Sequence, residues 1–507
     1  MAAATDRPQR ASRAGAPRAS TARRLSVAGM HLDRAADMPL YQQVAAHLRD
    51  RILDGGLPAG SRLIGSREIA RELGCSRVIV LAALELLYAE GYLLSVPRGG
   101  VRVAALGRKV APDAPPPRAD IEPSRLSHRW RSVLAIDYAF DLASPFSTGT
   151  PDIADFPFDT WARLLRQAWR HAPRSACTDM SPLGWRPLRE ATAEFLGTVR
   201  GLLCRPEEVV ITPASAGALD LCCRMLIDPG DEVWVEEPGF IEARWALQAA
   251  GARLVPVPVD SKGLVVAEGV RRAPRAKLAV VTPSHQFPLG VAMSLDRRLE
   301  LLDWAQAQGA WIIEDDYNSE FRHRDSMAAS LKSLDRAGHV IYLGTFSKVM
   351  LPSLRIGYLV ASTAFVEAFG RGRARIDVHT AGTAQPALAE FLREGHLLRY
   401  LRRMRPVYAA RKQAVLDALQ ALLPEELEVA PSGAGLHLTG LFTPRLAARL
   451  TDREASARSR RAGNFIQPLS QCYVGVPDRQ GLVIGFGRLP TEEARPRLAA
   501  VAALLRG

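Results

Sequence analysis

Apolar residues recur at helical spacing from Tyr41 onward, with Val44, Leu48 and Ile52 on one face. This period predicts an amphipathic helix. The pair Gly55-Gly56, followed by a proline, predicts where that helix ends.

Two further helical runs follow, and Ser66 and Ser76 stand at their starts. A serine hydroxyl there can accept a hydrogen bond from a free amide of the first turn, so we expect both serines to cap helices. Two short apolar runs, 92–94 and 101–103, flank a Pro-Arg-Gly-Gly turn and predict a β-hairpin. Residues 37–103 are therefore predicted to form a winged helix-turn-helix.

The longer part of the chain, 138–507, has a different pattern. Apolar runs typical of strands, at 232–235, 278–282 and 310–314, alternate with helical patterns. Such alternation predicts an α/β domain built on a mainly parallel, doubly wound sheet.

Two stretches lack periodic apolar spacing. Residues 1–36 contain seven Arg against two Asp and are expected to be a disordered basic arm. Residues 104–137 contain three consecutive prolines, 115–117, and are expected to be an extended linker between the two domains.

Composition narrows the protein class. The chain has 507 residues, is 48% hydrophobic and 23% charged, and carries a net charge of +13. No apolar run reaches the ~18 residues that span a bilayer, and the Arg-rich start lacks the apolar core of a secretory signal. The six cysteines are scattered without metal-binding spacing, so neither a disulfide framework nor a metal site is indicated. We expect a cytoplasmic protein without membrane contact.

A helix-turn-helix that reads DNA places the start of its last helix in the major groove. The residues at the two helix starts would then contact bases or phosphates, and the wing would contact the DNA backbone. The candidate DNA-binding residues are Ser66, Arg67, Ser76, Arg77 and Arg98. Periodicity alone leaves open a protein-interaction module in which these arginines are merely solvated.

The strings "PLYQQVAAHLRDRIL", "SREIARELGCSR" and "LYAEGYL" closely resemble the GntR family of bacterial winged-helix regulators. The resemblance implies binding to a double-stranded DNA operator. Family members usually have Pro-Ser where this chain has Ile64-Gly65, and a threonine at Ile79. A phosphate-contacting hydroxyl is therefore missing.

The segment Gly344-Thr345-Phe346-Ser347-Lys348 carries the most informative chemistry. A lysine amine on such a loop can form a Schiff base with an aldehyde, and hydroxyls with the later Arg355 can hold a phosphate. Taken alone, a Ser-Lys pair on a loop is more often a surface lysine.

The context favours the functional interpretation. An apolar strand ends in Glu314-Asp315-Asp316-Tyr317, at the edge where α/β sheets present ligand-binding groups. A carboxylate there can pair with a protonated pyridine nitrogen, although the acidic run alone also suits a magnesium site or a helix cap. Phe240 follows another strand and offers a face for stacking, although a lone Phe is usually part of the core.

The strings "WIIEDDYNSEF" and "VIYLGTFSKVMLPSLRIGYL" strongly resemble fold-type I, class I aminotransferases. With the winged helix in front, the chain looks most like MocR/GabR-type regulators. The resemblance implies a smaller C-terminal α/β subdomain, a homodimer and the cofactor pyridoxal 5'-phosphate. It implies Lys348 as the Schiff-base lysine and, as further cofactor-binding residues, Asp315, Tyr317, Phe240, Ser215, Ala216, Thr345, Ser347, Arg355 and Gln286.

Three departures from the family bear on cofactor binding. At the phosphate-binding helix start the usual Ser-Gly is Pro213-Ala214, so Ala214 must adopt a backbone shape that favours glycine. The tyrosine that a neighbouring subunit commonly supplies is Asp179, and the asparagine before the Pro-Thr-Gly motif is Phe287.

Two residues are candidates for binding an effector. Aminotransferases clamp a substrate carboxylate with an arginine on a late strand, but this strand is apolar and only Arg488 stands at its end. Glu242 could face the outer end of the effector and would favour an amine there. Both residues could equally be solvated surface charges.

These observations predict a transcription regulator that carries its cofactor as an internal aldimine on Lys348. An effector with an amino group would exchange with Lys348 and thereby change DNA binding. One rival is an active aminotransferase with an appended DNA-binding or regulatory domain. Another is a regulator whose cofactor site has decayed.

Overall fold

The computed structural model describes residues 24–25, 30–96, 100–105, 125–136, 138, 141–172, 180–317, 319–321, 329–433 and 435–506. The wing residue Arg98 and the departure at Asp179 lie outside these ranges. Contacts divide the chain into two compact units, 1–122 and 123–507. The boundary falls inside the segment predicted as a linker.

In its described residues, the smaller unit has three helices and a small sheet. Its elements are β1 (Arg24–Leu25), α1 (Leu40–Leu53), β2 (Arg62–Leu63), α2 (Ser66–Glu72), α3 (Arg77–Ala89), β3 (Leu93–Val96) and β4 (Gly100–Val103), with sheet order β1-β2-β4-β3. Val44, Leu48 and Ile52 are buried together with Leu84 from α3. The predicted winged helix-turn-helix is confirmed.

The end of the predicted basic arm is ordered, in contrast to our expectation. The Gln43 side chain accepts a hydrogen bond from Asp33 N and donates to Asp33 O, at 3.0 and 2.8 Å. Met30 and Leu32 pack against the core of this unit. Two apolar side chains and the polar contacts therefore hold a segment whose composition alone predicts disorder.

The larger unit contains an eight-stranded sheet of order β5-β12-β11-β10-β9-β6-β7-β8. Its strands are β5 (Val209–Thr212), β6 (Glu232–Glu237), β7 (Arg253–Asp260), β8 (Gly263–Leu264), β9 (Leu278–Val281), β10 (Trp311–Asp315), β11 (Val340–Thr345) and β12 (Gly357–Val360). The β7-β6-β9-β10-β11 pairs are parallel, whereas β12 is antiparallel to both of its neighbours. The predicted mainly parallel sheet is confirmed.

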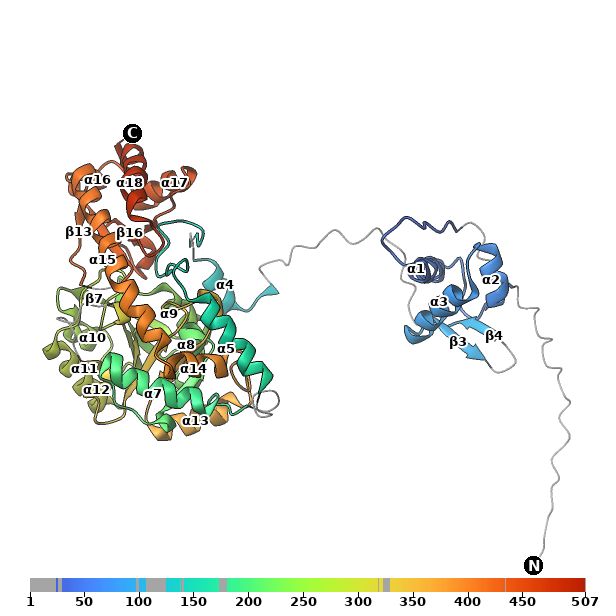
Figure 1. Ribbon diagram of the computed structural model, residues 1–507, viewed down its shortest axis with the longest axis horizontal. Coiled ribbons are helices and arrows are strands. Elements are labelled where there is room, and N and C mark those ends of the chain that lie inside the picture. The colour runs from blue at the N-terminus through green and yellow to red at the C-terminus, as the bar shows by residue number, and fades with distance from the viewer. Residues whose placement is uncertain are drawn as a thin grey trace, which may run out of the picture. The chain divides into compact units, whose positions relative to one another are not determined.

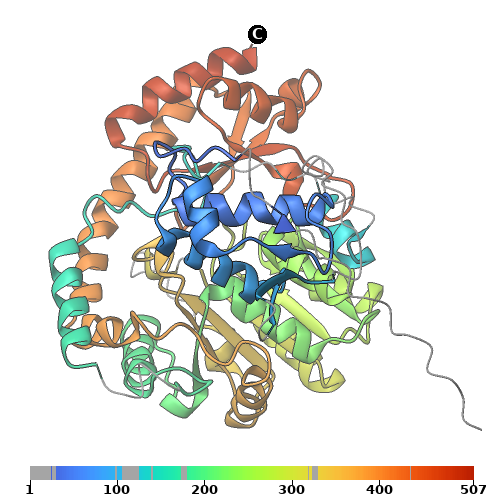
Figure 2. The ribbon, with the colours of Figure 1, turned by 90° about the vertical axis from the view of Figure 1, so that its right-hand side faces the viewer.

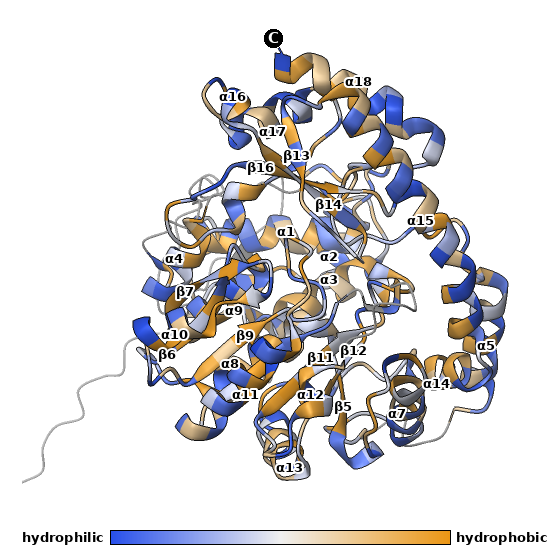
Figure 3. Cartoon of the chain, turned by 90° about the vertical axis from the view of Figure 1, so that its left-hand side faces the viewer, coloured by the Kyte–Doolittle hydropathy of each residue, from blue (hydrophilic) through white to orange (hydrophobic). Residues whose placement is uncertain are grey.

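Alternate residues of each strand face opposite layers of helices. Val233 and Ile313 pack in one buried cluster with residues of α8 (Ala214–Leu226), α9 (Ile241–Ala250) and α13 (Thr363–Arg373). Trp234 and Ile312 pack in another with residues of α10 (Val266–Arg272), α11 (Leu295–Gln308) and α12 (Leu331–Leu334). Figure 3 shows β9, β11 and β12 as largely hydrophobic strands, whereas α11 alternates hydrophobic and hydrophilic residues. A sheet covered on both faces leaves its strand ends to carry polar chemistry.

A smaller C-terminal subdomain, as the resemblance implied, is built on a second sheet of order β13-β14-β16-β15. Its strands are β13 (Leu427–Val429), β14 (His437–Phe442), β15 (Gln467–Pro468) and β16 (Gly481–Gly485), with helices α16 (Pro444–Ala447), α17 (Asp452–Arg461) and α18 (Thr491–Arg506). The red and orange segments of Figures 1 and 2 show this subdomain at the C-terminal end of the larger unit.

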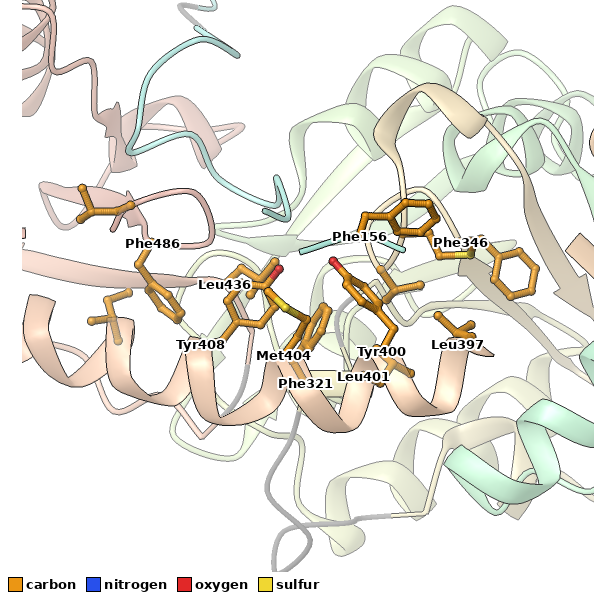
Figure 4. Packing of buried hydrophobic residues seen from close by; sticks show 14 of the residues in the cluster. Phe156, Phe321, Phe346, Leu397, Tyr400, Leu401, Met404, Tyr408, Leu436 and Phe486 are labelled. Carbon is orange, nitrogen blue, oxygen red and sulfur yellow. The ribbon is translucent and has the colours of Figure 1, made fainter. Parts of the chain in front are cut away.

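The helix α15 (His396–Leu422) ties this subdomain to the rest of the unit. Its inner face carries Leu397, Tyr400 and Met404, which pack with Phe156 from the segment before α5 (Phe158–Arg170). Figure 4 shows these side chains in a continuous row that reaches Phe486 of the subdomain. The same cluster includes residues of α7 (Arg186–Arg200) and α14 (Gln385–Arg393).

Part of the predicted linker is helical. Residues 128–134 form α4 (His128–Leu134), which packs on α9 and is capped by Ser127, whose Oγ accepts from Trp130 N. The preceding prolines obscured this short helix in the sequence. Within the described residues, no helix is long and apolar enough to cross a membrane.

Gly357 provides a test of the packing beside β12. A Cβ at this position would lie 2.7 Å from Gly344 O and 2.8 Å from the carbonyl carbon of Ala214. Because both neighbours are backbone, Gly357→Ala should lower the free energy of unfolding by about 1–3 kcal/mol in chemical denaturation.

The matched control is Gly197→Ala, within α7, where the nearest atom to a new Cβ is Leu203 Cδ2 at 3.8 Å. This helical substitution should stabilise the unit by about 0.5–1 kcal/mol. Equal effects of the two substitutions would contradict the close packing around Gly357.

Candidate cofactor and effector site

The candidate site forms where parallel strands end. Strand β10 ends at Asp315, β11 ends at Thr345, and β6 ends at Glu237, three residues before Phe240. Asp315 pairs in register with Leu343 of β11. Because these strands run in one direction, their carboxyl ends meet at one edge and bring together residues far apart in the sequence.

The amine of Lys348 lies over two aromatic rings at this edge. Its Nζ is 4.7 Å from the ring centroid of Tyr317 and 5.1 Å from that of Phe240. The two rings are parallel within 2°, with centroids 6.3 Å apart. A Cβ on Gly149 would lie 3.7 Å from Nζ, so this glycine packs closely over the amine. The structure therefore brings Lys348, Phe240 and Tyr317 together.

Asp315 is buried below the same site, and its side chain is only 3% exposed. Its Oδ1 has no hydrogen-bond partner among the described residues. Burial raises the pKa of Asp315 to about 7, although the charge of Lys348 opposes that shift. An unpaired buried carboxylate is costly, and a cationic N–H group placed there would compensate it.

A buried ion pair holds the chain between Asp315 and Tyr317. Asp316 lies 2.5 Å from the guanidinium of Arg200, and both side chains are almost fully buried. Tyr342 donates to Asp316 at 2.7 Å, and Arg200 donates to Ser284 Oγ at 3.1 Å. Sequence reasoning missed both charged residues. The run of acidic residues after the strand could have indicated Asp316, whereas nothing in the sequence around Arg200 indicates its role.

Candidate phosphate ligands come from two segments. Thr345 and Ser347 are buried, and Thr345 Oγ1 accepts from Ser347 N at 3.1 Å. The Ser347 Oγ is buried without a hydrogen-bond partner among the described residues. Ser215 is buried in the first turn of α8, beside half-buried Ala216. An unpaired hydroxyl and a helix start suit an anion.

Two backbone positions in this region have left-handed conformations. Ala214 has φ +60°, which confirms the expectation that it takes a shape favouring glycine. Arg355 has φ +49°, and its side chain is exposed. Thr212 Oγ1 donates to Ala214 O at 3.2 Å, which helps to hold the strained turn before α8.

Gln286 has a structural role in the loop beside the site. Its amide nitrogen donates to Pro238 O at 2.8 Å and to Phe287 O at 2.6 Å, and its oxygen accepts from Leu289 N. These contacts engage the side chain that we predicted to bind cofactor. Phe287 packs edge-on against Phe240, with centroids 5.8 Å apart.

The two candidate effector residues differ in position. Glu242 is half-buried. Burial raises the pKa of Glu242, and the charge of Lys348 opposes part of that rise, so the carboxyl lies near the amine. Arg488 is exposed and donates to Leu142 O at 2.5 Å. Among the described residues, Arg488 makes no hydrogen bond or ion pair with Lys348, Phe240 or Tyr317. On the preceding strand, Val483 is buried in a cluster with Phe287 and Tyr317.

The candidate DNA-binding residues lie at the starts of α2 and α3. Ser76 caps α3, as predicted, and its Oγ accepts from Ile79 N. The prediction for Ser66 was wrong: Gly65 occupies the N-cap position, and Ser66 Oγ accepts from Arg77 Nε at 3.2 Å instead. Arg67 and Arg77 are exposed. Ser66 therefore orients an exposed guanidinium at the start of α3.

Comparisons with known proteins agree with both units. Residues 40–103 match the model of bacterial regulatory proteins of the gntR family, and 146–478 match aminotransferase class I and II. The probable rhizopine catabolism regulatory protein MocR of Rhizobium meliloti is 38% identical, with 92% of this chain and 93% of that protein covered. This chain belongs to the MocR-type regulators. The pyridoxine biosynthesis transcriptional regulator PdxR of Corynebacterium glutamicum, also HTH-type, is 32% identical, covering 90% and 94% of the two chains.

Solved structures resemble the larger unit of this MocR-type chain. An archaeal alanine:glyoxylate aminotransferase has a TM-score of 0.67 and 28% identity, covering 71% of this chain and 90% of its own. The α-aminoadipate aminotransferase LysN of Thermus thermophilus, complexed with N-(5'-phosphopyridoxyl)-L-leucine, has a TM-score of 0.66 and 27% identity, covering 75% and 95%. These similarities confirm the aminotransferase fold.

The aminotransferase fold implies pyridoxal 5'-phosphate as cofactor, and the residues of this MocR-type site fit that group. The unpaired Asp315 Oδ1 suits a protonated pyridine nitrogen, and the unpaired Ser347 Oγ suits a phosphate oxygen. The amine of Lys348 lies over the rings of both Phe240 and Tyr317. The donor set therefore matches an aromatic aldehyde with a phosphate arm.

The raised pKa of Asp315 predicts that Asp315→Asn stabilises the cofactor-free chain but weakens cofactor binding. Folding raises the pKa from 3.8 to about 7, so the cofactor-free protein loses stability as pH rises through that window. The variant escapes this loss and should gain up to about 4 kcal/mol at pH ~8, and almost nothing at pH ~4. Thermal unfolding of the cofactor-free chain at both pH values measures the gain.

With pyridoxal phosphate bound, the same variant should lose cofactor affinity because it no longer pairs with the pyridine nitrogen. Asp303→Asn, an exposed carboxyl on α11, is the matched control and should change neither property. A gain that is equal at both pH values would contradict the buried-carboxylate argument.

Proposed function

We propose that this MocR-type chain is a transcription regulator that senses an amino-group metabolite at Lys348 and converts its binding into a change in DNA affinity. The observation that supports this most directly is that Lys348 Nζ lies over both of the parallel rings of Phe240 and Tyr317. Its sequence relatives that carry both domains are described as regulators.

When bound, pyridoxal phosphate supplies an aldehyde that condenses reversibly with amines. Asp315 would keep a proton on the pyridine nitrogen, while Ser347, Thr345, Arg355 and the first amides of α8 would bind the phosphate. Phe240 would stack on the ring, and Tyr317 would donate to its hydroxyl. Lys348 would supply the amine to which the cofactor attaches, and an effector amine would compete with it for that attachment.

The surroundings of Lys348 favour sensing over turnover. An aminotransferase clamps the carboxylate of its substrate, but Val483 makes this strand apolar, and Arg488 is engaged with Leu142 O. Glu242 adds a negative charge near the amine, which favours a second cationic group on the effector. We therefore assign the site to reversible exchange of an amine.

The DNA-binding unit would read an operator through Arg77 and Ser76, with Arg67 and Arg98 on the backbone. By analogy with the aminotransferase fold, we propose a homodimer, which would match two operator half-sites. The effector would bias DNA binding through its different affinities for the free and DNA-bound arrangements.

Replacing the lysine tests the sensing proposal. Lys348→Ala should abolish the visible absorbance band of lysine-bound pyridoxal phosphate, because it removes the amine that lies over Phe240 and Tyr317. An effector amine titrated into the unaltered chain should shift that band without sustained consumption of amine. Lys277→Ala, an exposed lysine, should leave the spectrum unchanged.

Two outcomes would overturn this proposal. A band that persists in the Lys348→Ala variant would exclude this lysine as the site of attachment. Continuous conversion of an amino acid and a keto acid would identify a working aminotransferase instead.

The start of α3 generates a separate prediction. Arg77→Ala should abolish retention of a promoter fragment, with at least a tenfold loss of affinity, in line with the ~1–3 kcal/mol of one specific arginine contact. Ser66→Ala should cause a smaller loss because it removes only the hydrogen bond that orients Arg77. Gel-shift titration at constant salt measures both.

Arg51→Ala is the charge-matched control, since it removes one arginine from α1, outside the helix-turn-helix. Its affinity should stay within about twofold of the unaltered protein. Unchanged binding by the Arg77→Ala variant would rule out α3 as the recognition helix.

A further inference from the structure

A second cavity, of about 450 Å³, lies in the larger unit. Ser132 lines it from α4, Arg244 and Gln248 from α9, and Arg453 and Ser470 from the C-terminal subdomain. Figure 1 shows α4 beside α9, and the two helices pack on each other. The volume is in the range of small-molecule sites.

The charges that line this cavity have one sign. Arg244 and Arg453 both contribute, and none of the described residues lining the cavity is an Asp or a Glu. Serine, glutamine and backbone groups make up much of the remaining wall. A cavity with two guanidinium groups and no lining carboxylate attracts an anion.

The charge of Arg244 is only partly compensated. Its Nη1 donates to Tyr473 O at 2.8 Å, but its buried Nε has no hydrogen-bond partner among the described residues. Burial lowers the pKa of Arg244, and the nearby Glu237 opposes this only in part. A second charged group would therefore be favourable beside this guanidinium.

Glu237 does not serve as a dedicated partner of Arg244. Its carboxylate accepts from Val474 N at 2.8 Å and from Gly475 N at 2.7 Å. These bonds fix the segment that forms one wall of the cavity. Gln248 adds a buried amide oxygen without a partner among the described residues. Because this oxygen is an acceptor, it suits an N–H or O–H group of a ligand and not its charged oxygens.

We propose that this cavity is a second ligand site, which takes a small anion with a carboxylate or phosphate group between Arg244 and Arg453. The ligand would join three separate parts of the chain: α4, α9 and the 470–477 segment. Helix α9 starts next to the stacking residue Phe240, and α4 is the first described helix after the boundary between the two units.

Calorimetric titration of the full chain, saturated with pyridoxal phosphate, tests this proposal. Inorganic phosphate and succinate are titrated in separate arms at matched ionic strength. At least one should bind, and the arm that binds distinguishes a phosphate from a carboxylate ligand. Arg453→Gln should weaken that binding at least tenfold, and Arg244→Gln should do the same.

Arg244→Gln also removes the hydrogen bond to Tyr473 O, so a loss of binding in that variant could reflect a changed structure. Arg453 is exposed, and Arg453→Gln is therefore the decisive variant. Arg402→Gln, an exposed arginine on α15, is the matched control and should bind as the unaltered chain does. Cofactor absorbance must stay constant throughout, since its loss would place the anion at the cofactor's own phosphate site and overturn the proposal. Absence of binding in both arms, or full binding by Arg453→Gln, would also overturn it.

Discussion

The candidate site depends on one buried ion pair, between Arg200 at the end of α7 and Asp316 just beyond β10. Neither charge reaches solvent, and removing one partner of such a pair costs about 3–5 kcal/mol because the other is left uncompensated. Tyr342 and Ser284 supply further hydrogen bonds to the pair. Asp316 lies between Asp315 and Tyr317 in the sequence. Its pairing with Arg200 therefore fixes the backbone that carries these two residues beside Lys348.

The rest of the site follows from the sheet. Parallel strands deliver a carboxylate, an amine and two aromatic rings to one edge. Asp315 and Ser347 each retain an unpaired buried oxygen, and Ala214 and Arg355 have strained backbones. Such unsatisfied groups persist only when the surrounding packing imposes them, and they concentrate at functional sites.

Much of this arrangement could be predicted from the sequence because the signals were local. Helical spacing around Leu48, the serine before α3 and the run of acids after an apolar strand each correspond to one structural element. The unusual conformation of Ala214 was also predictable, since it stands where related chains have glycine. Long-range contacts were not predictable in this way. Gln43 orders the arm, Arg200 pairs with Asp316, and Gln286 bonds to Pro238, and no local pattern signals any of these.

Ser66 illustrates the same limit within a single motif. Its sequence position suits a helix cap, yet the neighbouring arginine of α3 uses its hydroxyl. The hydroxyl could either cap α2 or accept from Arg77, and the structure has the contact with Arg77. The short helix α4 was hidden for a related reason, because its packing on α9 stabilises a segment whose flanking composition favours extended chain.

Gly149 makes the loop beside Lys348 dependent on one residue type. Its φ is +64°, a left-handed backbone conformation that residues with a side chain rarely adopt. The space itself is sufficient, because a Cβ there would lie 3.6 Å from Lys348 Cε and 3.7 Å from Nζ, which is ordinary van der Waals contact. An alanine would therefore be disfavoured by the backbone and not by a clash with the lysine, so the course of this loop over the amine requires glycine.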